Sequence, residues 1–214
     1  MSDDSAPTGT KADLIAAGLH LFGRDGFAAT STRALAGRAG TNVASIAYHF
    51  GGKDGLRLAC GAEVQRRVGK VAGLPGPDAV DPGMPPEQAR QRLEAMLRAM
   101  VQFLTQVPEA ADIVGFIMRE FAEDGPVLDQ IYGHFFLPKH RELCQLVAIA
   151  TGRDADSQDT RLLVFSMLGQ AVYFRIGQSL ICRRMGWQSY GPDEARAIAD
   201  RLVANLHAVL EAAP

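Results

Sequence analysis

The chain has 214 residues, of which 47% are apolar, so it can bury a sizeable core and wholesale disorder is excluded. Its three cysteines, Cys60, Cys144 and Cys182, show no CxxC spacing. This pattern argues against a disulfide framework or a zinc finger and fits a reducing compartment. No apolar run reaches the roughly 18 residues of a membrane span, and the acidic start lacks the features of a signal peptide. We therefore expect a cytoplasmic protein with no membrane partner.

The net charge of −2 conceals an uneven distribution. Residues 10–70 carry nine Lys and Arg against four Asp and Glu, whereas residues 71–214 carry 13 basic and 18 acidic residues. A basic head on an acidic body suggests that only the head meets a polyanion such as nucleic acid. The alternative is chance, because an excess of five positive charges is modest.

The first third of the chain predicts four helices, at 11–24, 33–38, 42–50 and 54–70. Gly23 and Gly26 are expected to end the first helix, and Gly40 permits a tight turn between the second and the third. The Thr30-Ser31-Thr32 run offers capping oxygens for the second helix, and Asn42 offers one for the third. Gly51 and Gly52 are expected to end the third helix.

Residues 74–86 contain five prolines, which rule out a continuous helix in this segment. We place a domain boundary within or just before this segment, giving a domain of residues 1–70 and a second of residues 85–214. Further helices are predicted at 87–106, 109–123, 126–151 with a kink at Pro138, 158–184 and 193–211. Strand signals are weak throughout, so the expected fold class is all-α.

Two short helices joined by a glycine-containing turn and backed by a first helix form a helix-turn-helix unit, whose second helix enters the major groove of DNA. Here that helix has a predicted apolar inner edge of Val43, Ile46, Ala47 and Phe50. Its outer edge of short polar side chains is suited to bases and phosphates. The predicted DNA-binding residues are Ser31, Thr32, Arg33, Asn42, Ser45, Tyr48, His49 and Lys53.

The order of residues is more specific than their spacing. The segment TSTRALAGRAGTNVASIAYHFGGKDGL, residues 30–56, closely resembles the DNA-binding domain of the TetR family of bacterial transcriptional regulators. The first helix matches as well, so the resemblance covers about residues 11–60. The chain departs from the family pattern at Thr41, Asn42 and Ala47, and these changes leave its operator unpredicted. Later pieces, such as HFFLPKHRELCQLVAIATG and MLGQAVYFRIGQSLICRRMGW, resemble the C-terminal domain of the CecR (CerR-type) subgroup.

The resemblance implies a repressor that a small-molecule effector releases from a palindromic double-stranded DNA operator. It also implies a homodimer in which helices 158–184 and 193–211 of two copies form a four-helix bundle. A two-fold dimer is expected independently, because one short helix reads too few base pairs. The Met- and Phe-rich body could hold an apolar ligand. The candidate ligand-binding residues, each of which has plain core packing as its alternative, are Met96, Met100, Phe103, Ile117, Phe121, His134, Phe165 and Phe174.

The sequence also bears on functions other than DNA binding. The sequence has no nucleophile elbow, Walker loop or HExxH motif, which argues against an enzyme, and no cofactor is expected. His140 and Cys144 have a helical i, i+4 spacing that can hold a metal, but two residues without a carboxylate are weak support, so we predict no metal site. The alternatives are a helical enzyme or small-molecule binding protein with an incidental helix-turn-helix resemblance, and an activator or dual regulator with the same DNA-binding head.

Overall fold

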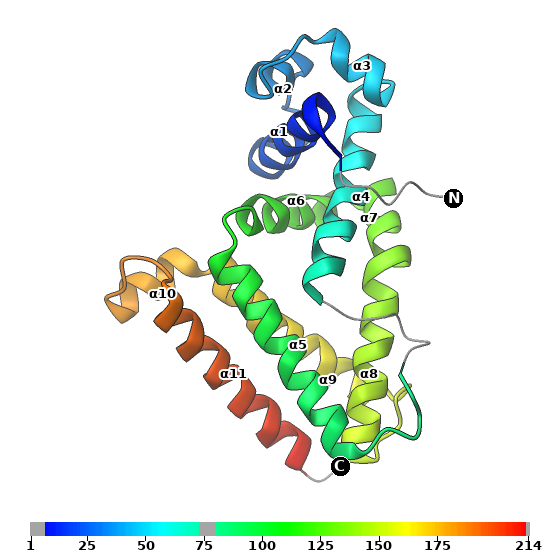
Figure 1. Ribbon diagram of the computed structural model, residues 1–214, viewed down its shortest axis with the longest axis vertical. Coiled ribbons are helices and arrows are strands. Elements are labelled where there is room, and N and C mark those ends of the chain that lie inside the picture. The colour runs from blue at the N-terminus through cyan, green and yellow to red at the C-terminus, as the bar shows by residue number, and fades with distance from the viewer. Residues whose placement is uncertain (1–6, 73–79, 213–214) are drawn as a thin grey trace. The chain divides into compact units, whose positions relative to one another are not determined.

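The structure is a computed structural model that describes residues 7–72 and 80–212 (Figure 1). Every regular element within these ranges is helical, which confirms the predicted all-α class. The α-helices are α1 (Gly9–Asp25), α2 (Thr32–Arg38), α3 (Ala44–Phe50), α4 (Lys53–Ala72), α5 (Pro86–Gln106), α6 (Ala110–Glu123), α7 (Pro126–Ile131), α8 (Leu137–Thr151), α9 (Gln158–Ile176), α10 (Gln178–Met185) and α11 (Pro192–Glu211). A short π-helix, η2 (Tyr132–Phe136), lies between α7 and α8.

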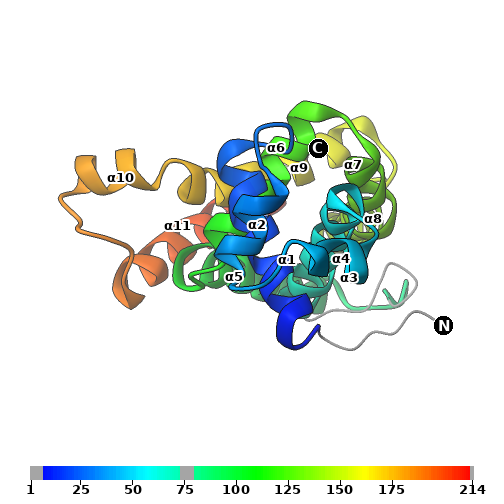
Figure 2. The same cartoon turned by 90° about the horizontal axis from the view of Figure 1, so that it is seen from above.

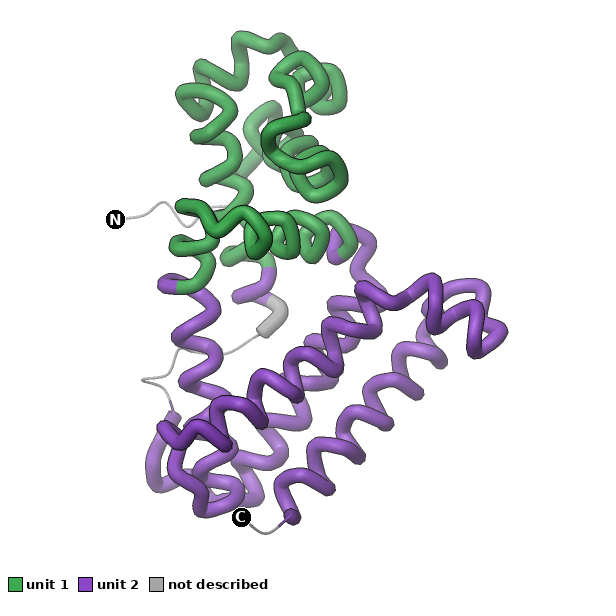
Figure 3. The backbone as a smooth tube through the Cα atoms, turned by 180° about the vertical axis from the view of Figure 1, so that it is seen from behind, with its two compact units in different colours: residues 1–67, 111–132 green, residues 68–110, 133–214 purple. Residues whose placement is uncertain are grey.

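The chain packs into two compact units (Figure 3). The first comprises residues 1–67 and 111–132, and the second comprises residues 68–110 and 133–214. Packing therefore groups α6 and α7 with the N-terminal helices. This division concerns packing alone, and the functional division into residues 1–70 and 85–214 stays a prediction. The predicted boundary falls partly on residues 73–79, which lie outside the described residues.

The first unit is built around one apolar core. The helices α1, α2 and α3 contact one another in pairs, as Figure 2 shows from above. Their apolar stripes meet at side chains that are at most 1% exposed, and α4 and α6 add further ones. These core residues are Leu14, Phe22, Leu35, Ile46, Leu56 and Phe116.

Glycines with positive φ end two of the N-terminal helices and form the turn between α2 and α3. Gly26 (φ 85°) follows α1, Gly40 (φ 63°) lies in the turn, and Gly51 (φ 73°) follows α3. The prediction that Gly23 helps to end the first helix was wrong, because α1 continues to Asp25. Gly23 instead allows α1 to approach α6 closely: a Cβ there would lie 2.8 Å from the backbone nitrogen of Phe116.

The second unit is centred on α5, which contacts α8, α9 and α11. Its interior contains a buried acid, Glu142, whose carboxylate accepts hydrogen bonds from Arg92 at 2.8 Å and from Lys139 at 2.9 Å. The Glu142 side chain is 0% exposed, so these two cations supply the compensation that a buried charge requires. Among the described residues, none of the helices has the length and hydropathy needed to cross a lipid bilayer.

Two long helices predicted in the second half of the chain are interrupted. The predicted helix 126–151 consists of α7, η2 and α8, and Pro138 lies in the first turn of α8. Proline lacks an N–H group and its ring clashes with the carbonyl four residues earlier, and a wider π-turn before Pro138 relieves both problems. The irregularity therefore precedes the proline, whereas a simple kink at Pro138 was expected.

The predicted helix 158–184 is broken at Gly177, between α9 and α10. The hydroxyl of Tyr190 donates to the carbonyl oxygen of Phe174 at 2.9 Å. In a continuous helix this carbonyl would accept from residue 178. A side chain beyond α10 thus takes the acceptor that continuation of α9 needs, and the chain then returns to α11 (Figure 2).

Candidate DNA-binding surface

The helix α3 is anchored by a narrow apolar edge. Ile46 is 1% exposed and Phe50 is half-buried, as predicted for the inner face. Val43 (41% exposed) and Ala47 are on the outside, so their predicted inward orientation was wrong. Ile46 and Phe50 share the inner face of α3 by i, i+4 spacing, whereas Ala47 is rotated by about 100° from Ile46 and Val43 precedes the helix.

The opposite face of α3 is open to solvent. Tyr48 is 85% exposed, and its ring makes an edge contact with His49 at a centroid distance of 4.9 Å. Ala44 and Ala47 are also exposed, at the i−4 and i−1 positions from Tyr48. Such small residues let a helix approach the floor of a major groove, where alanine can contact the thymine methyl group. The sequence interpretation missed both alanines, although i, i+3, i+4 spacing opposite Ile46 would have indicated them.

Three predicted site residues also cap or brace the short helices. The Ser31 hydroxyl oxygen accepts from the Ala34 backbone N–H at 3.1 Å, which confirms it as the N-cap of α2. The Asn42 side-chain oxygen accepts from the Ala44 N–H at 3.0 Å. The hydroxyl oxygens of Ser45 and Thr41 lie 3.0 Å apart. These contacts fix the side chains close to the helix ends and still leave donor groups for a phosphate or a base.

The amino end of α2 carries an outward-facing cation, Arg33. Arg33 is exposed and, within the described parts of the chain, forms no ion pair. The neighbouring Thr32 is half-buried and is the first residue of α2. Arg33 can therefore bind a phosphate without losing an internal ion pair. Most other arginines of this unit already bind partners within the chain.

Lys53 is placed differently from what its predicted phosphate contact suggests. Its ammonium group donates to the carbonyl oxygens of Phe27 at 2.9 Å and Thr30 at 3.0 Å. It also lies 4.2 Å from the centroid of the Phe27 ring. An ammonium group has three donors, so one remains after these two hydrogen bonds. The DNA contact of Lys53 stays a prediction, and the structure adds an internal role.

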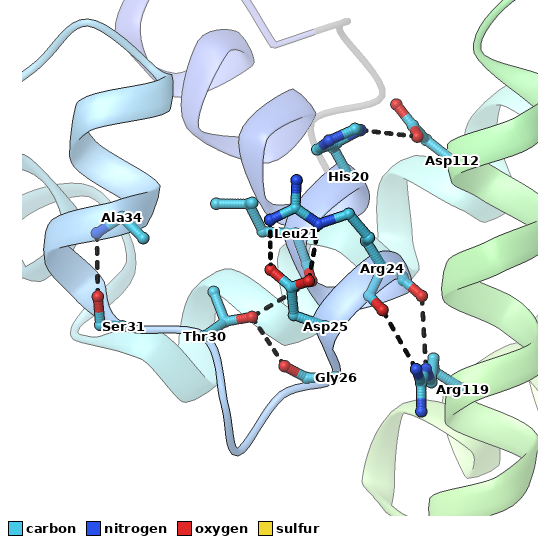
Figure 4. A network of polar contacts seen from close by, with 11 residues as sticks. His20, Leu21, Arg24, Asp25, Gly26, Thr30, Ser31, Ala34, Asp112 and Arg119 are labelled. Carbon is cyan, nitrogen blue, oxygen red and sulfur yellow. Dashed lines mark hydrogen bonds and ion pairs between the residues drawn. The ribbon is translucent and has the colours of Figure 1, made fainter.

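The loop between α1 and α2 is closed by Thr30, which is 3% exposed. Its hydroxyl group lies within hydrogen-bonding distance of two carbonyl oxygens, that of Gly26 at 2.7 Å and that of Leu21 at 3.2 Å (Figure 4). On the other side of α1, Arg119 of α6 donates to the carbonyl oxygens of Gly23 and Arg24 (Figure 4). Arg119 therefore satisfies two of the free carbonyls at the end of α1, and Thr30 ties the following loop to the helix.

The helices α1 and α6 are also joined by side chains. The His20 ring nitrogen Nδ1 lies 3.0 Å from a carboxylate oxygen of Asp112 (Figure 4). Together with the Arg119 contacts and the close approach at Gly23, this pair makes α6 an integral part of the unit that carries α2 and α3.

The eight predicted ligand-binding residues do not form one cluster. Ile117 and Phe121 belong to the first unit, and the other six belong to the second. Phe121, Phe165 and His134 are exposed. Two cavities described in the second unit, of about 30 and 190 Å³, are lined by none of the eight. The four that remain together on contacting helices are Met96, Met100 and Phe103 of α5 and Phe174 of α9.

The two residues considered for a metal are buried neighbours. The Cys144 sulfur lies 3.6 Å from Nδ1 of His140, whose pKa is lowered chiefly by burial. The described residues hold no group of three or more His, Cys, Asp or Glu side chains that could bind a metal ion. Burial raises the pKa of the Cys60 and Cys144 thiols, so both act as small core residues. All three cysteines are free.

Comparison with protein families gives two matches that together span most of the chain. Residues 14–60 match the model described as bacterial regulatory proteins, tetR family. Residues 89–213 match the model described as the C-terminal domain of the HTH-type transcriptional dual regulator CecR. The first match contains α2 and α3 with the surface described above.

Two curated proteins are similar to the chain. One is the HTH-type transcriptional dual regulator CecR of Shigella flexneri, with 31% identity over 207 residues that cover 94% of this chain and 91% of that protein. The other is the probable HTH-type transcriptional regulator YttP of Bacillus subtilis (strain 168), with 25% identity over 64% of this chain and 62% of that protein.

Solved structures share the fold at lower identity. A TetR-like transcriptional regulator from Rhodococcus sp. RHA1 has a TM-score of 0.64 at 18% identity, covering 95% of this chain and 99% of that one. AibR, solved in complex with isovaleryl coenzyme A and operator DNA, has a TM-score of 0.65 at 18% identity, covering 92% and 97%. The family matches and the 31% identity together decide the assignment: the chain belongs to the TetR family of bacterial DNA-binding transcriptional regulators, a non-enzymatic family, and carries a CecR-type C-terminal domain.

Proposed function

We propose that the chain is a repressor that binds a palindromic operator as a homodimer and is released by a small, largely apolar ligand. The observation that carries the DNA-contact part is the open face of α3, where an 85% exposed tyrosine stands on a helix anchored by a fully buried isoleucine. A tyrosine combines a large apolar ring with a hydroxyl group, so in this open position it can contact a partner by packing and by hydrogen bonding together. We place this action in the bacterial cytoplasm, where the operator DNA is.

The position of each side chain supports a proposed division of the DNA contacts. We assign Tyr48, His49 and Ala47 to the groove, and Ser31, Thr32, Arg33 and Asn42 to the phosphates on either side. Ser45 lies on the flank of α3 and braces the turn through Thr41. Base-reading atoms in this set are few, so phosphate contacts supply most of the affinity and binding weakens steeply with salt.

Support for a homodimer comes from the second unit. One face of α9 and α10 exposes large apolar side chains at helical spacing, a stripe of five residues that are 50–63% exposed: Leu162, Phe165, Tyr173, Ile176 and Leu180. The neighbouring α11 exposes small residues at the same kind of spacing, Ala197, Ala204 and Ala208. Large side chains of one copy can pack on the small ones of a second copy about a two-fold axis, which is how four helices form a bundle.

For the effector we narrow the predicted site to Met96, Met100, Phe103 and Phe174. These side chains lie on α5 and α9, two helices that contact each other within the second unit. Methionine and phenylalanine suit an apolar ligand because they repack at low cost. A ligand there releases DNA only if it binds the DNA-free state more tightly than the DNA-bound state.

Dual regulation is a second candidate. The Shigella flexneri relative, at 31% identity, is described as a dual regulator, so activation at some promoters would accompany repression at others. A reporter fused to a promoter bound by the protein, measured in a deletion strain and in the complemented strain, separates the two. Repression alone predicts that every bound promoter gives a higher reporter signal in the deletion strain than in the complemented strain. Dual regulation predicts that some promoters give a lower signal in the deletion strain.

The DNA-contact proposal is tested with Tyr48. Duplexes are first selected by the wild-type protein from a genomic pool, and the affinity of Tyr48→Ala for the best duplex is then measured by electrophoretic shift. We expect affinity to fall by about ten- to a hundredfold, because the ring and its hydroxyl contact DNA directly. The melting temperature should stay within about 1 °C, because the Tyr48 side chain is 85% exposed.

A matched control is Leu58→Ala, which removes a 43% exposed apolar side chain from α4. It should change neither affinity nor melting temperature appreciably. Equal affinity of Tyr48→Ala and Leu58→Ala would remove the proposed role of the α3 face. A wild-type protein that selects no duplex even at low ionic strength would contradict operator binding itself.

A further inference from the structure

Two cations of α4, Lys53 and Arg57, contact the loop between α1 and α2. The Phe27 ring lies against both of them, 4.2 Å from the Lys53 nitrogen and 4.5 Å from the Arg57 guanidinium carbon. Lys53 also bonds the carbonyl oxygens of Phe27 and Thr30. A cation within about 6 Å of a ring centroid is attracted to its face. The loop is therefore fixed both through its backbone and through its one aromatic side chain.

Arg57 is itself held in place by α6. Its Nε and Nη2 atoms donate to the two carboxylate oxygens of Glu120, each at 2.9 Å, and Nη2 also donates to Glu123. The side chains of Arg57 and Glu120 are only 13% and 2% exposed. Burial alone would lower the pKa of Arg57, but Glu120 and Glu123 outweigh it and raise the pKa above its ordinary value. The guanidinium is thus permanently charged and held in one orientation.

This loop leads directly into the DNA-binding surface. Thr30, whose carbonyl Lys53 binds, is followed by Ser31, the N-cap of α2. A shift of the loop therefore moves the amino end of α2, and with it Arg33. Arg57 faces Phe27 and Glu120 and has little exposed surface, so it is poorly placed to meet a phosphate.

We propose that Arg57 is a positioning residue for DNA binding: held by Glu120 of α6, it clamps Phe27 so that the α1–α2 loop presents α2 to the phosphates. This inference rests on the proposed DNA-binding surface. The same clamp gives Lys53 its internal role, since both cations act on one ring. It also makes the position of the DNA-binding surface depend on the carboxylate of Glu120 in α6, 63 residues away in sequence from Arg57.

The salt dependence of DNA binding separates positioning from direct contact. The probe is the best duplex that the wild-type protein selects from a genomic pool. We expect Arg57→Met to bind it about tenfold more weakly at every salt concentration, since the ion pairs with Glu120 and Glu123 and the contact with the Phe27 ring are lost. The slope of log affinity against log salt should stay that of the wild type, because no phosphate contact is removed. The comparison variant Arg33→Met should lower that slope by about one.

Two further variants test how Arg57 acts. Arg57→Lys keeps a cation near the ring and near Glu120, so it should recover most of the lost affinity. Phe27→Leu keeps an apolar, though smaller, side chain, removes the ring face and leaves Glu120 paired, so it should weaken binding with an unchanged slope. If Arg57→Met does not fold, Phe27→Leu alone shows whether the contact between Arg57 and the Phe27 ring matters for DNA binding.

Two results would overturn the inference. A slope reduced by about one in Arg57→Met would make Arg57 a phosphate contact. Wild-type affinity in folded Phe27→Leu, or in folded Arg57→Met, would show that the clamp does not matter for DNA binding. Failure of the proposed function is distinguishable, because in that case the wild-type protein would select no duplex at all.

Discussion

Gly55→Ala is expected to lower the melting temperature sharply and to abolish operator binding. Gly55 lies in the first turn of α4, where a Cβ would stand 1.8 Å from the carbonyl oxygen and 2.9 Å from the carbonyl carbon of Phe50. Phe50 is the last residue of α3. Backbone atoms cannot rotate away, so α3 and α4 must separate. We expect a loss of about 3 kcal/mol in the free energy of unfolding, the upper part of the usual range for overpacking.

The matched control lies on the same helix. At Gly69 a Cβ would meet no atom within 4 Å, so Gly69→Ala should be neutral or should stabilise α4 by up to about 1 kcal/mol. Thermal unfolding followed by circular dichroism compares the two variants, and an electrophoretic shift reports α3. If Gly55→Ala and Gly69→Ala have the same melting temperature and the same DNA affinity, then the α3–α4 turn adapts to the methyl group. The close approach of Gly55 to Phe50 then has no consequence.

The elements of the DNA-binding head could be predicted because their signals are local. The Ser31 cap, the Gly40 turn and the Gly51 stop each depend on residues within four positions, and the structure contains all three. The same short order of residues identified the family. The error at Val43 and Ala47 has a local cause too: in a seven-residue helix, apolarity alone does not define a face.

The contacts that hold the head together could not be predicted in this way. Lys53 reaches Phe27 across 26 positions, and Arg57 reaches Glu120 across 63. Periodicity reports which face of a helix is buried, not which distant side chain meets it. The sequence around Lys53 suggested a phosphate contact. It gave no sign of the internal contacts, because the carbonyl oxygens that Lys53 binds belong to the distant loop between α1 and α2.

The breaks in the long helices of the body have the same origin. Gly177 is one glycine within a favourable helical pattern, and glycines often occur there without ending a helix. The hydroxyl of Tyr190 makes the difference, because it occupies the carbonyl of Phe174. Phe165 of the exposed α9 stripe was likewise interpreted as core or ligand site, since an exposed apolar side chain looks in sequence like one that fills a core.

Gly169→Glu is expected to convert the protein to monomers without harming the fold of each copy. Gly169 is exposed in the middle of the α9 stripe, and a Cβ there would meet no atom within 4 Å. Within one chain the substitution replaces a poor helix former by a good one, which should stabilise α9 by up to about 1 kcal/mol. In a bundle of two copies, the same carboxylate would be buried in an apolar interface without a partner, at a cost of several kcal/mol.

Mass measurement in solution and DNA affinity follow the two effects separately. Gly169→Glu should remain monomeric at micromolar concentration, with a melting temperature independent of protein concentration. Its operator affinity should fall at least about a hundredfold, because each copy then reads one half-site alone. Gln102→Glu adds a carboxylate to an exposed position of α5 outside the stripe, and it should stay dimeric and bind as the wild type does.

The pattern of outcomes distinguishes the dimer face from the DNA contacts. Gly169 belongs to the second unit and α3 to the first, so the variant leaves the side chains proposed to contact DNA unchanged. Dimeric Gly169→Glu with full affinity would move the interface off the α9 stripe. Monomeric protein with full affinity would mean that one copy suffices on DNA, against the two-fold model. Only coupled loss of both properties supports a dimer that reads two half-sites through paired α3 helices.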